Sequence, residues 1–246
     1  MYAQTLNDTI NSIPWKKIVL NNNARFRHHQ ELNRGSGFLF KYHENIIACT
    51  ARDFTGTIYT QEEMIKIRDF DEEVASWKMF VTDDPSMEVI LDTLVLKNRI
   101  EKTFSVFMYS MPFLTFSVRE KHEAIIALEP DINRIRNGTT LYLAGYDDDH
   151  NLRIVTCVVE TALNEKYADG IIRVKTDDYL HFDDFVGAPI INGEGKAVGV
   201  INRAYALKKN KKGRLISHDK EVEGAYFEFF VNGTPMRDIL GKDYIP

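Results

Sequence analysis

Residues 181–184 gather three side chains that could do chemistry, just before a glycine-containing turn. They supply the imidazole of His181 and the carboxylates of Asp183 and Asp184. If Asp53 lies nearby in the fold, these groups would line one groove and bind a basic peptide or a cation. The plainer interpretation is that they solvate a surface loop. Both interpretations remain open at this point.

Two other groups of titratable residues are weaker candidates for a metal site. Residues 147–149 are three aspartates followed by His150, but consecutive side chains point in different directions and no calcium-loop spacing follows. His28 and His29 have no ligand partner at the four-residue spacing of helical metal motifs. We therefore predict no metal site and no cofactor.

The charge and hydropathy of the chain argue against several partners. The 246 residues carry a formal net charge of −5 with an isoelectric point near 5.8, which argues against a nucleic acid or an acidic membrane. A basic run at residues 208–214 predicts a solvated hairpin tip, with a docking patch for an acidic partner as the alternative. The most apolar stretch, residues 103–118, is too short to cross a bilayer.

The cysteine usage and the N-terminus indicate a location. Cys49 and Cys157 each lie inside an apolar, strand-like run, which predicts two buried free thiols and no disulfide scaffold. The first residues lack a basic region followed by a long apolar run, so we expect no signal peptide and a cytoplasmic location.

Most of the elements that would position these residues have the residue pattern of β-strands. Helical patterns occur only at residues 60–70 and at 234–240, where Thr234 would cap a helix with Pro235 in its first turn. Many short strands and one closing helix predict an all-β barrel or sandwich. The predicted strands are 37–42, 45–49, 77–81, 87–96, 103–109, 140–144, 152–159, 170–174, 188–191, 197–201 and 225–231.

Four segments, in this order, resemble the trypsin-like (chymotrypsin-fold) serine peptidases, especially their bacterial branch. Residues 35–40 (GSGFLF) resemble an early strand of the family, and residues 46–54 (IIACTARDF) the strand and turn that normally end in the catalytic histidine. Residues 135–146 (IRNGTTLYLAGY) resemble the strand that opens the second barrel. The most specific segment, residues 184–201 (DFVGAPIINGEGKAVGVI), is similar to the Gly-Asp-Ser-Gly-Gly-Pro turn and the strands after it.

The catalytic residues that this resemblance implies are missing. The nucleophile position falls on Val186, whose side chain has no lone pair and cannot be acylated. The histidine position falls on Asp53 or, in another register, on Ala51. Independently of the alignment, no serine occurs between Ser117 and Ser217, and no histidine between His43 and His122.

The remaining catalytic positions are also altered. The acid falls on Asp92 or, in a spacing that fits residue 145 better, on Thr103. The oxyanion-hole amides would be those of Asp184 and Val186, and a carboxylate at Asp184 would repel a developing oxyanion.

The resemblance therefore implies a trypsin-like double six-stranded Greek-key β-barrel with a short C-terminal helix and no proteolytic activity. Residues 1–115 would form an N-terminal extension and the first barrel, and residues 116–246 the second barrel and the helix. We expect a pseudoprotease that binds a peptide or protein in the cleft between the barrels, lined by His181, Asp183, Asp184, Phe185 and Asn202.

Two alternatives keep an enzymatic role. One is a hydrolase of another class, with chemistry relocated to Asp53, Asp183, Asp184 or a metal. The other is weak residual peptidase activity through an unrecognised nucleophile, with Ser36, Ser105 and Ser110 as the candidates.

Overall fold

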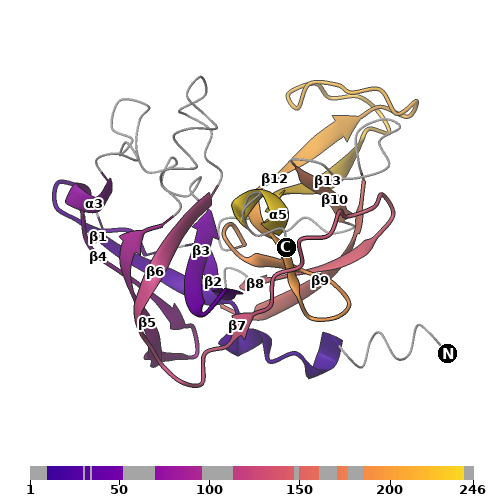
Figure 1. Cartoon of the computed structure of the whole chain (residues 1–246). Coiled ribbons are helices and arrows are strands. Elements are labelled where there is room, and N and C mark those ends of the chain that lie inside the picture. Colours follow the sequence, from indigo (N-terminus) through magenta and orange to yellow (C-terminus); the bar gives the residue numbers. More distant parts are fainter. Residues whose placement is uncertain are drawn as a thin grey trace.

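Two closed β-barrels lie side by side in the computed structural model of the chain (Figure 1). The structure describes residues 10–29, 31–33, 35–51, 70–95, 113–146, 150–160, 171–176 and 185–240. The all-β fold predicted from the sequence is confirmed. No helix in these ranges is long and apolar enough to span a membrane.

The first barrel is a closed ring of six antiparallel strands. Going around the ring, the order is β1-β2-β3-β6-β5-β4, and the β1–β4 pairing closes it. A short helix, α3 (Phe70–Glu73), precedes β4. The strands are β1 (Leu20–Phe26), β2 (Ser36–Tyr42), β3 (Asn45–Ala51), β4 (Val74–Val81), β5 (Asp84–Leu94) and β6 (Phe113–Lys121).

The second barrel repeats the same connectivity. Its ring order is β8-β9-β10-β13-β12-β11, closed by the β8–β11 pairing, so in both barrels the sixth strand lies between the third and the fifth. Helix α5 (Met236–Leu240) follows directly. The strands are β8 (Thr140–Tyr146), β9 (Leu152–Val159), β10 (Ile172–Thr176), β11 (Pro189–Ile191), β12 (Ala197–Lys209) and β13 (Tyr226–Pro235).

Strand β2 is buried on both sides, which explains its continuous apolar run. Leu39 points into the core of the first barrel, whereas Phe38 and Phe40 belong to a second core that fills the other barrel and reaches across the junction. Alternating side chains of a strand point to opposite faces, so a strand between two cores has no polar face. The 3-10 helix η1 (Trp15–Lys17) adds Trp15 to this second core.

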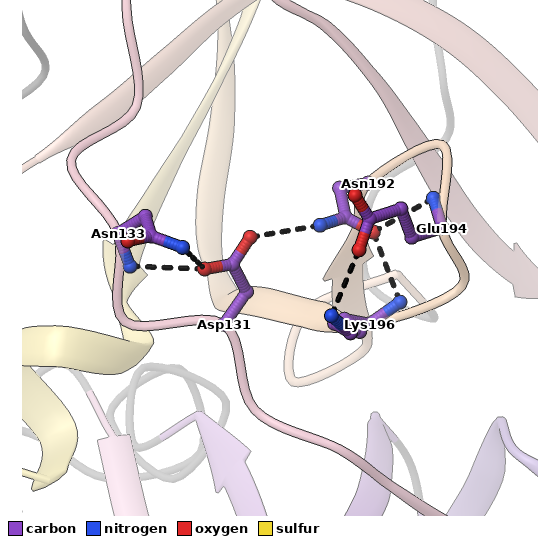
Figure 2. Close-up of polar contacts among 5 residues, drawn as sticks. All are labelled: Asp131, Asn133, Asn192, Glu194 and Lys196. Carbon is purple, nitrogen blue, oxygen red and sulfur yellow. Dashed lines mark hydrogen bonds and ion pairs between the residues drawn. The ribbon is translucent and has the colours of Figure 1, made fainter.

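The linker between the barrels is bonded to both of them. Its short strand β7 (Ala127–Leu128) pairs in parallel with β2 of the first barrel. Further on, Asp131 accepts hydrogen bonds from Asn133 and, at 2.9 Å, from the Asn192 side chain in the β11–β12 turn (Figure 2). Asn192 in turn accepts from the backbone N–H groups of Glu194 and Lys196. The linker therefore fixes the β11–β12 hairpin relative to the first barrel.

Several element boundaries differ from the predicted ones. β12 continues eight residues beyond the predicted end at 201 and forms a long ribbon with β13, whose tip carries the basic run as predicted. β6 crosses the predicted boundary between residues 115 and 116. The predicted capping of the last helix is wrong: Thr234 and Pro235 still pair with Val200 and Gly199 in the sheet, and the helix begins at Met236.

Candidate functional site

The turn before β11 places neighbouring residues in two different cores. Phe185 packs into the core of the second barrel, where its ring lies so close to Gly145 that a Cβ there would come within 2.6 Å of it. The next side chain, Val186, packs into the core of the first barrel. The backbone is anchored on both sides: the Ser36 N–H donates to the Val186 carbonyl, and the Gly187 N–H to the Ile201 carbonyl, both at 2.8 Å.

Gly187 packs closely against β2 and β3 of the first barrel. Its φ of +93° is a conformation that L residues rarely adopt. A Cβ at this position would lie 1.9 Å from the Ser36 carbonyl oxygen, 2.7 Å from Thr50 Oγ1 and 3.0 Å from the Ala51 nitrogen. Only glycine fits here, for reasons of both backbone conformation and space. We call Ser36, Thr50, Ala51, Val186 and Gly187 the barrel junction.

A buried polar network supports the junction from the side of the first barrel. The Asn22 side-chain amide donates to the carbonyls of Gly35 and Ser36 and to Thr50 Oγ1, at 2.8 to 3.1 Å. Its carbonyl oxygen accepts from the Trp77 indole at 3.0 Å. Thr50 Oγ1 donates to the Ser36 carbonyl at 2.6 Å. Every polar atom of the Asn22 side chain has a partner, so the network holds β1, β2 and β3 in fixed positions.

The structure brings together two of the residues assigned from the sequence to catalytic positions. Ala51 and Val186 lie at the same junction, and both are buried in the core of the first barrel. Their side chains are hydrocarbons, which neither accept a proton nor attack a carbonyl. The assignment of these two residues to the histidine and serine positions of the family stays a prediction.

The other predicted site residues are dispersed or lie outside the described ranges. Asp92 is an exposed residue of β5. Asn202 is buried, and its side-chain amide donates to Thr234 Oγ1 at 2.8 Å. The predicted positions Asp53, Thr103, His181, Asp183 and Asp184 lie outside the described residues. Within the described part of the chain, no three His, Cys, Asp or Glu side chains are close enough together to hold a metal ion.

Both cysteines are buried free thiols, as predicted. Burial raises the pKa of Cys49, and it raises the pKa of Cys157 to about 12; the Cys157 thiol donates a hydrogen bond to the Leu141 carbonyl. A thiol with so high a pKa stays protonated at neutral pH and is a poor nucleophile. Neither thiol is therefore a good candidate for a nucleophile at neutral pH.

One stretch of the β12 edge is free of partners within the described chain. β11 pairs with β12 only as far as Val200, and the Ile201 backbone then bonds to Gly187 and Ala188. At the other end the ribbon tip folds back, with the Ile216 N–H donating to the Lys208 carbonyl and His218 Nε2 lying 3.1 Å from the Ala206 oxygen. These contacts lie on the side of β12 away from β13.

Ala204 lies between these two covered stretches. Residues two apart in a strand direct their backbone groups to the same edge, so Ala204 shares this side with Ala206 and Lys208. Its N–H and carbonyl have no hydrogen-bond partner among the described residues. The sequence reasoning did not identify this edge, because strand pairing is not visible in the residue pattern of β12.

Comparisons with known proteins agree on the fold. No family model matches the sequence, and no curated protein matches it significantly. The chain is similar to the active form of the Rv3671c protease from Mycobacterium tuberculosis, with a TM-score of 0.50 and 13% identity, covering 92% of this chain and 80% of that one. The inactive serine-to-alanine mutant of that protease gives a TM-score of 0.50 and 12% identity, covering 95% and 87%.

A serine endoprotease from Yersinia pestis gives a TM-score of 0.49 and 10% identity, covering 95% of this chain. The present chain spans 63% of the length of that endoprotease. This chain has the all-β, double-barrel fold of the trypsin-like serine proteases.

Proposed function

We propose that the chain is a non-catalytic relative of the bacterial trypsin-like serine proteases and binds an extended peptide or protein segment beside the barrel junction. The observation that carries the proposal is the chemistry of the junction. Val186 and Ala51 both lie there, and both are hydrocarbons at positions that the family resemblance assigns to the nucleophile and, in one register, to the base.

The distribution of residues in the whole sequence supports the loss of catalysis. Acyl transfer by this fold needs a hydroxyl or thiol beside the turn and an imidazole to take its proton. Residues 118–216 contain no serine, and residues 44–121 contain no histidine. Cys157, the one thiol of the second barrel, has a pKa of about 12. A one-residue error in the alignment therefore restores neither group.

The capacity to bind a peptide does not depend on these residues. A strand edge with free N–H and carbonyl groups accepts another extended segment through backbone hydrogen bonds. Ala204 lies between the Ile201 backbone bonds to Gly187 and Ala188 and the tip contact at Ala206, and its own backbone groups have no partner among the described residues. A short extended segment would add to β12 at this point.

The test is the change Ala204→Pro, which removes the edge N–H without removing a ladder hydrogen bond to β13. Peptides are selected with wild-type protein from a display library of random 12-residue sequences, and their Kd values are measured by fluorescence polarisation. We expect wild-type binding, at least a tenfold weaker affinity in Ala204→Pro because one backbone hydrogen bond is lost, and no change in Ala204→Ser.

Two results would overturn this proposal. One is a selection from which no binding peptide emerges. The other is a set of selected peptides whose affinity for Ala204→Pro equals that for the wild type while the variant keeps its melting temperature, because binding would then not use this edge.

A further inference from the structure

The outer side of the β10–β13–β12 sheet carries cations stacked on aromatic rings. Arg173 and Arg203 flank Asn232 in one row across the three strands, and Lys175 and Tyr205 flank Phe230 in the next. The Arg173 guanidinium lies 4.2 Å from the centre of the Phe230 ring, Phe230 stacks on Tyr205 at 5.7 Å, and Arg203 lies 5.8 Å from Tyr205. We call Arg173, Lys175, Arg203, Tyr205, Lys209 and Phe230 the cation–aromatic face.

The positive charge of this face is only partly balanced. Its neighbour Glu228 accepts hydrogen bonds from Lys209 and Lys175, which lower the pKa of that carboxyl. Neither Arg173 nor Arg203 pairs with a carboxylate among the described residues, and Arg203 is exposed. The segment 203–228 holds seven Lys or Arg and four Asp or Glu residues, which gives it a formal net charge of +3. Because the whole chain has a net charge of −5, the remaining residues carry a net charge of −8.

The inner side of the same strand is apolar. Ala204 packs against the core of the second barrel, and Ala206 follows it on this side. Arg203 and Tyr205, on alternate positions, point to the outer side. A strand added along the edge at Ala204 would therefore place one set of side chains next to Ala204 and Ala206, and the other set next to Arg203 and Tyr205.

We propose that the bound segment is an acidic peptide in which carboxylate and apolar side chains alternate, with the carboxylates facing Arg203 on the cation–aromatic face. This inference rests on the proposed function, since it specifies the occupant of the Ala204 edge. Opposite charges on directly neighbouring strands stabilise their pairing, and the exposed guanidinium of Arg203, which has no carboxylate partner among the described residues, lies on the strand next to the added one.

A nucleic acid fits this face less well than an acidic peptide. Single strands are held by bases stacked on open aromatic rings, but the Phe230 ring is buried between Arg173 and Tyr205, and Arg203 lies over Tyr205. The net charge of −8 on the remaining residues also opposes the approach of a polyphosphate chain. A short peptide with a few carboxylates escapes most of this repulsion.

The experiment compares three labelled hexapeptides, Glu-Val-Glu-Val-Glu-Val and its Ser and Lys counterparts, by fluorescence polarisation against the full chain. At 50 mM salt we expect the Glu peptide to bind at least five times more tightly than the Ser peptide, with the difference shrinking at 500 mM salt. In Arg203→Glu the Glu peptide should bind at least ten times more weakly and the Lys peptide more tightly. Arg119→Glu, an equal charge change at an exposed site on β6, should leave all three unchanged.

The possible failures distinguish the two proposals. Equal binding of the Glu and Ser peptides to the wild type, lost for both in Ala204→Pro, overturns the acidic ligand and keeps the strand-addition site. Full binding of the Glu peptide to Ala204→Pro overturns the added strand as its mode of binding. Absence of binding by all three peptides overturns the acidic ligand, and the library selection then decides the proposed function by itself. A labelled ten-residue oligothymidine that binds more tightly than the Glu peptide overturns the inference in favour of a nucleic acid.

Discussion

Replacement of Gly187 by alanine is expected to unfold the junction between the barrels. The added Cβ would lie 1.9 Å from the Ser36 carbonyl oxygen, a backbone atom that cannot rotate away, and φ at +93° adds backbone strain. We expect a loss of more than about 4 kcal/mol in the free energy of unfolding, or no accumulation of soluble protein. Thermal and urea unfolding followed by circular dichroism measure the effect.

Gly138 provides the matched control for this change. Its φ of +79° is of the same kind, but a Cβ there would have no atom within 4 Å. Gly138→Ala should therefore cost only the backbone strain, about 1 to 2 kcal/mol. If Gly187→Ala were as stable as Gly138→Ala, the close contact between the turn and β2 would be refuted.

Replacement of Asn22 by leucine is expected to have the second-largest effect. The two side chains have similar sizes, but leucine leaves the Trp77 indole N–H without an acceptor and removes the amide donor from Ser36 and Thr50. Each buried polar group left unpaired costs about 1 to 3 kcal/mol, so we expect a total loss of about 3 kcal/mol. For a chain of this size, that lowers the melting temperature by about 6 to 12 °C.

A double-mutant cycle with Trp77→Phe isolates the indole contact. Phenylalanine needs no acceptor, so Asn22→Leu should cost about 1 kcal/mol less in the Trp77→Phe background than in the wild type. Strictly additive losses would contradict the Trp77–Asn22 hydrogen bond as a stabilising contact.

The sequence was sufficient for the fold class because the junction turn and its flanking strands keep a recognisable pattern. The glycine that must lie against Ser36, the apolar strands on either side of it and the closing helix are all local features. The apolar runs of β2 and β3 also have a physical origin, since both strands lie between two cores. The similar structures share the fold at an identity of only 12 to 13%.

Features that depend on pairing over long distances could not be predicted. β1 contains the polar run Asn21, Asn22 and Asn23 and gave no strand signal. Asn22 can be buried in a strand only because its side chain has hydrogen-bond partners, and these lie up to 55 residues away in the sequence. The length of β12 was underestimated since its second half is exposed and basic, and only the pairing with β13 makes it a strand. The last helix began later than expected because Thr234 is held by the sheet and by Asn202.

The candidate site was predicted in part. The sequence correctly identified a turn around Val186 and Gly187, and the structure places Ala51 beside it. Asp92, by contrast, is an exposed residue of β5, although its sequence context resembles the segment that carries the acid in the family. The proposed binding edge at Ala204 has no sequence signal, because any extended residue in that position offers the same backbone groups.

Whether any hydroxyl of this chain acts as an acyl-accepting nucleophile is measured with a fluorophosphonate probe read out by intact mass spectrometry, with trypsin labelled in parallel. The account predicts an unmodified mass for this chain after prolonged incubation, while trypsin takes up one adduct. A stoichiometric adduct on any serine, including Ser36 at the junction, that disappears on replacement of that serine by alanine would contradict it.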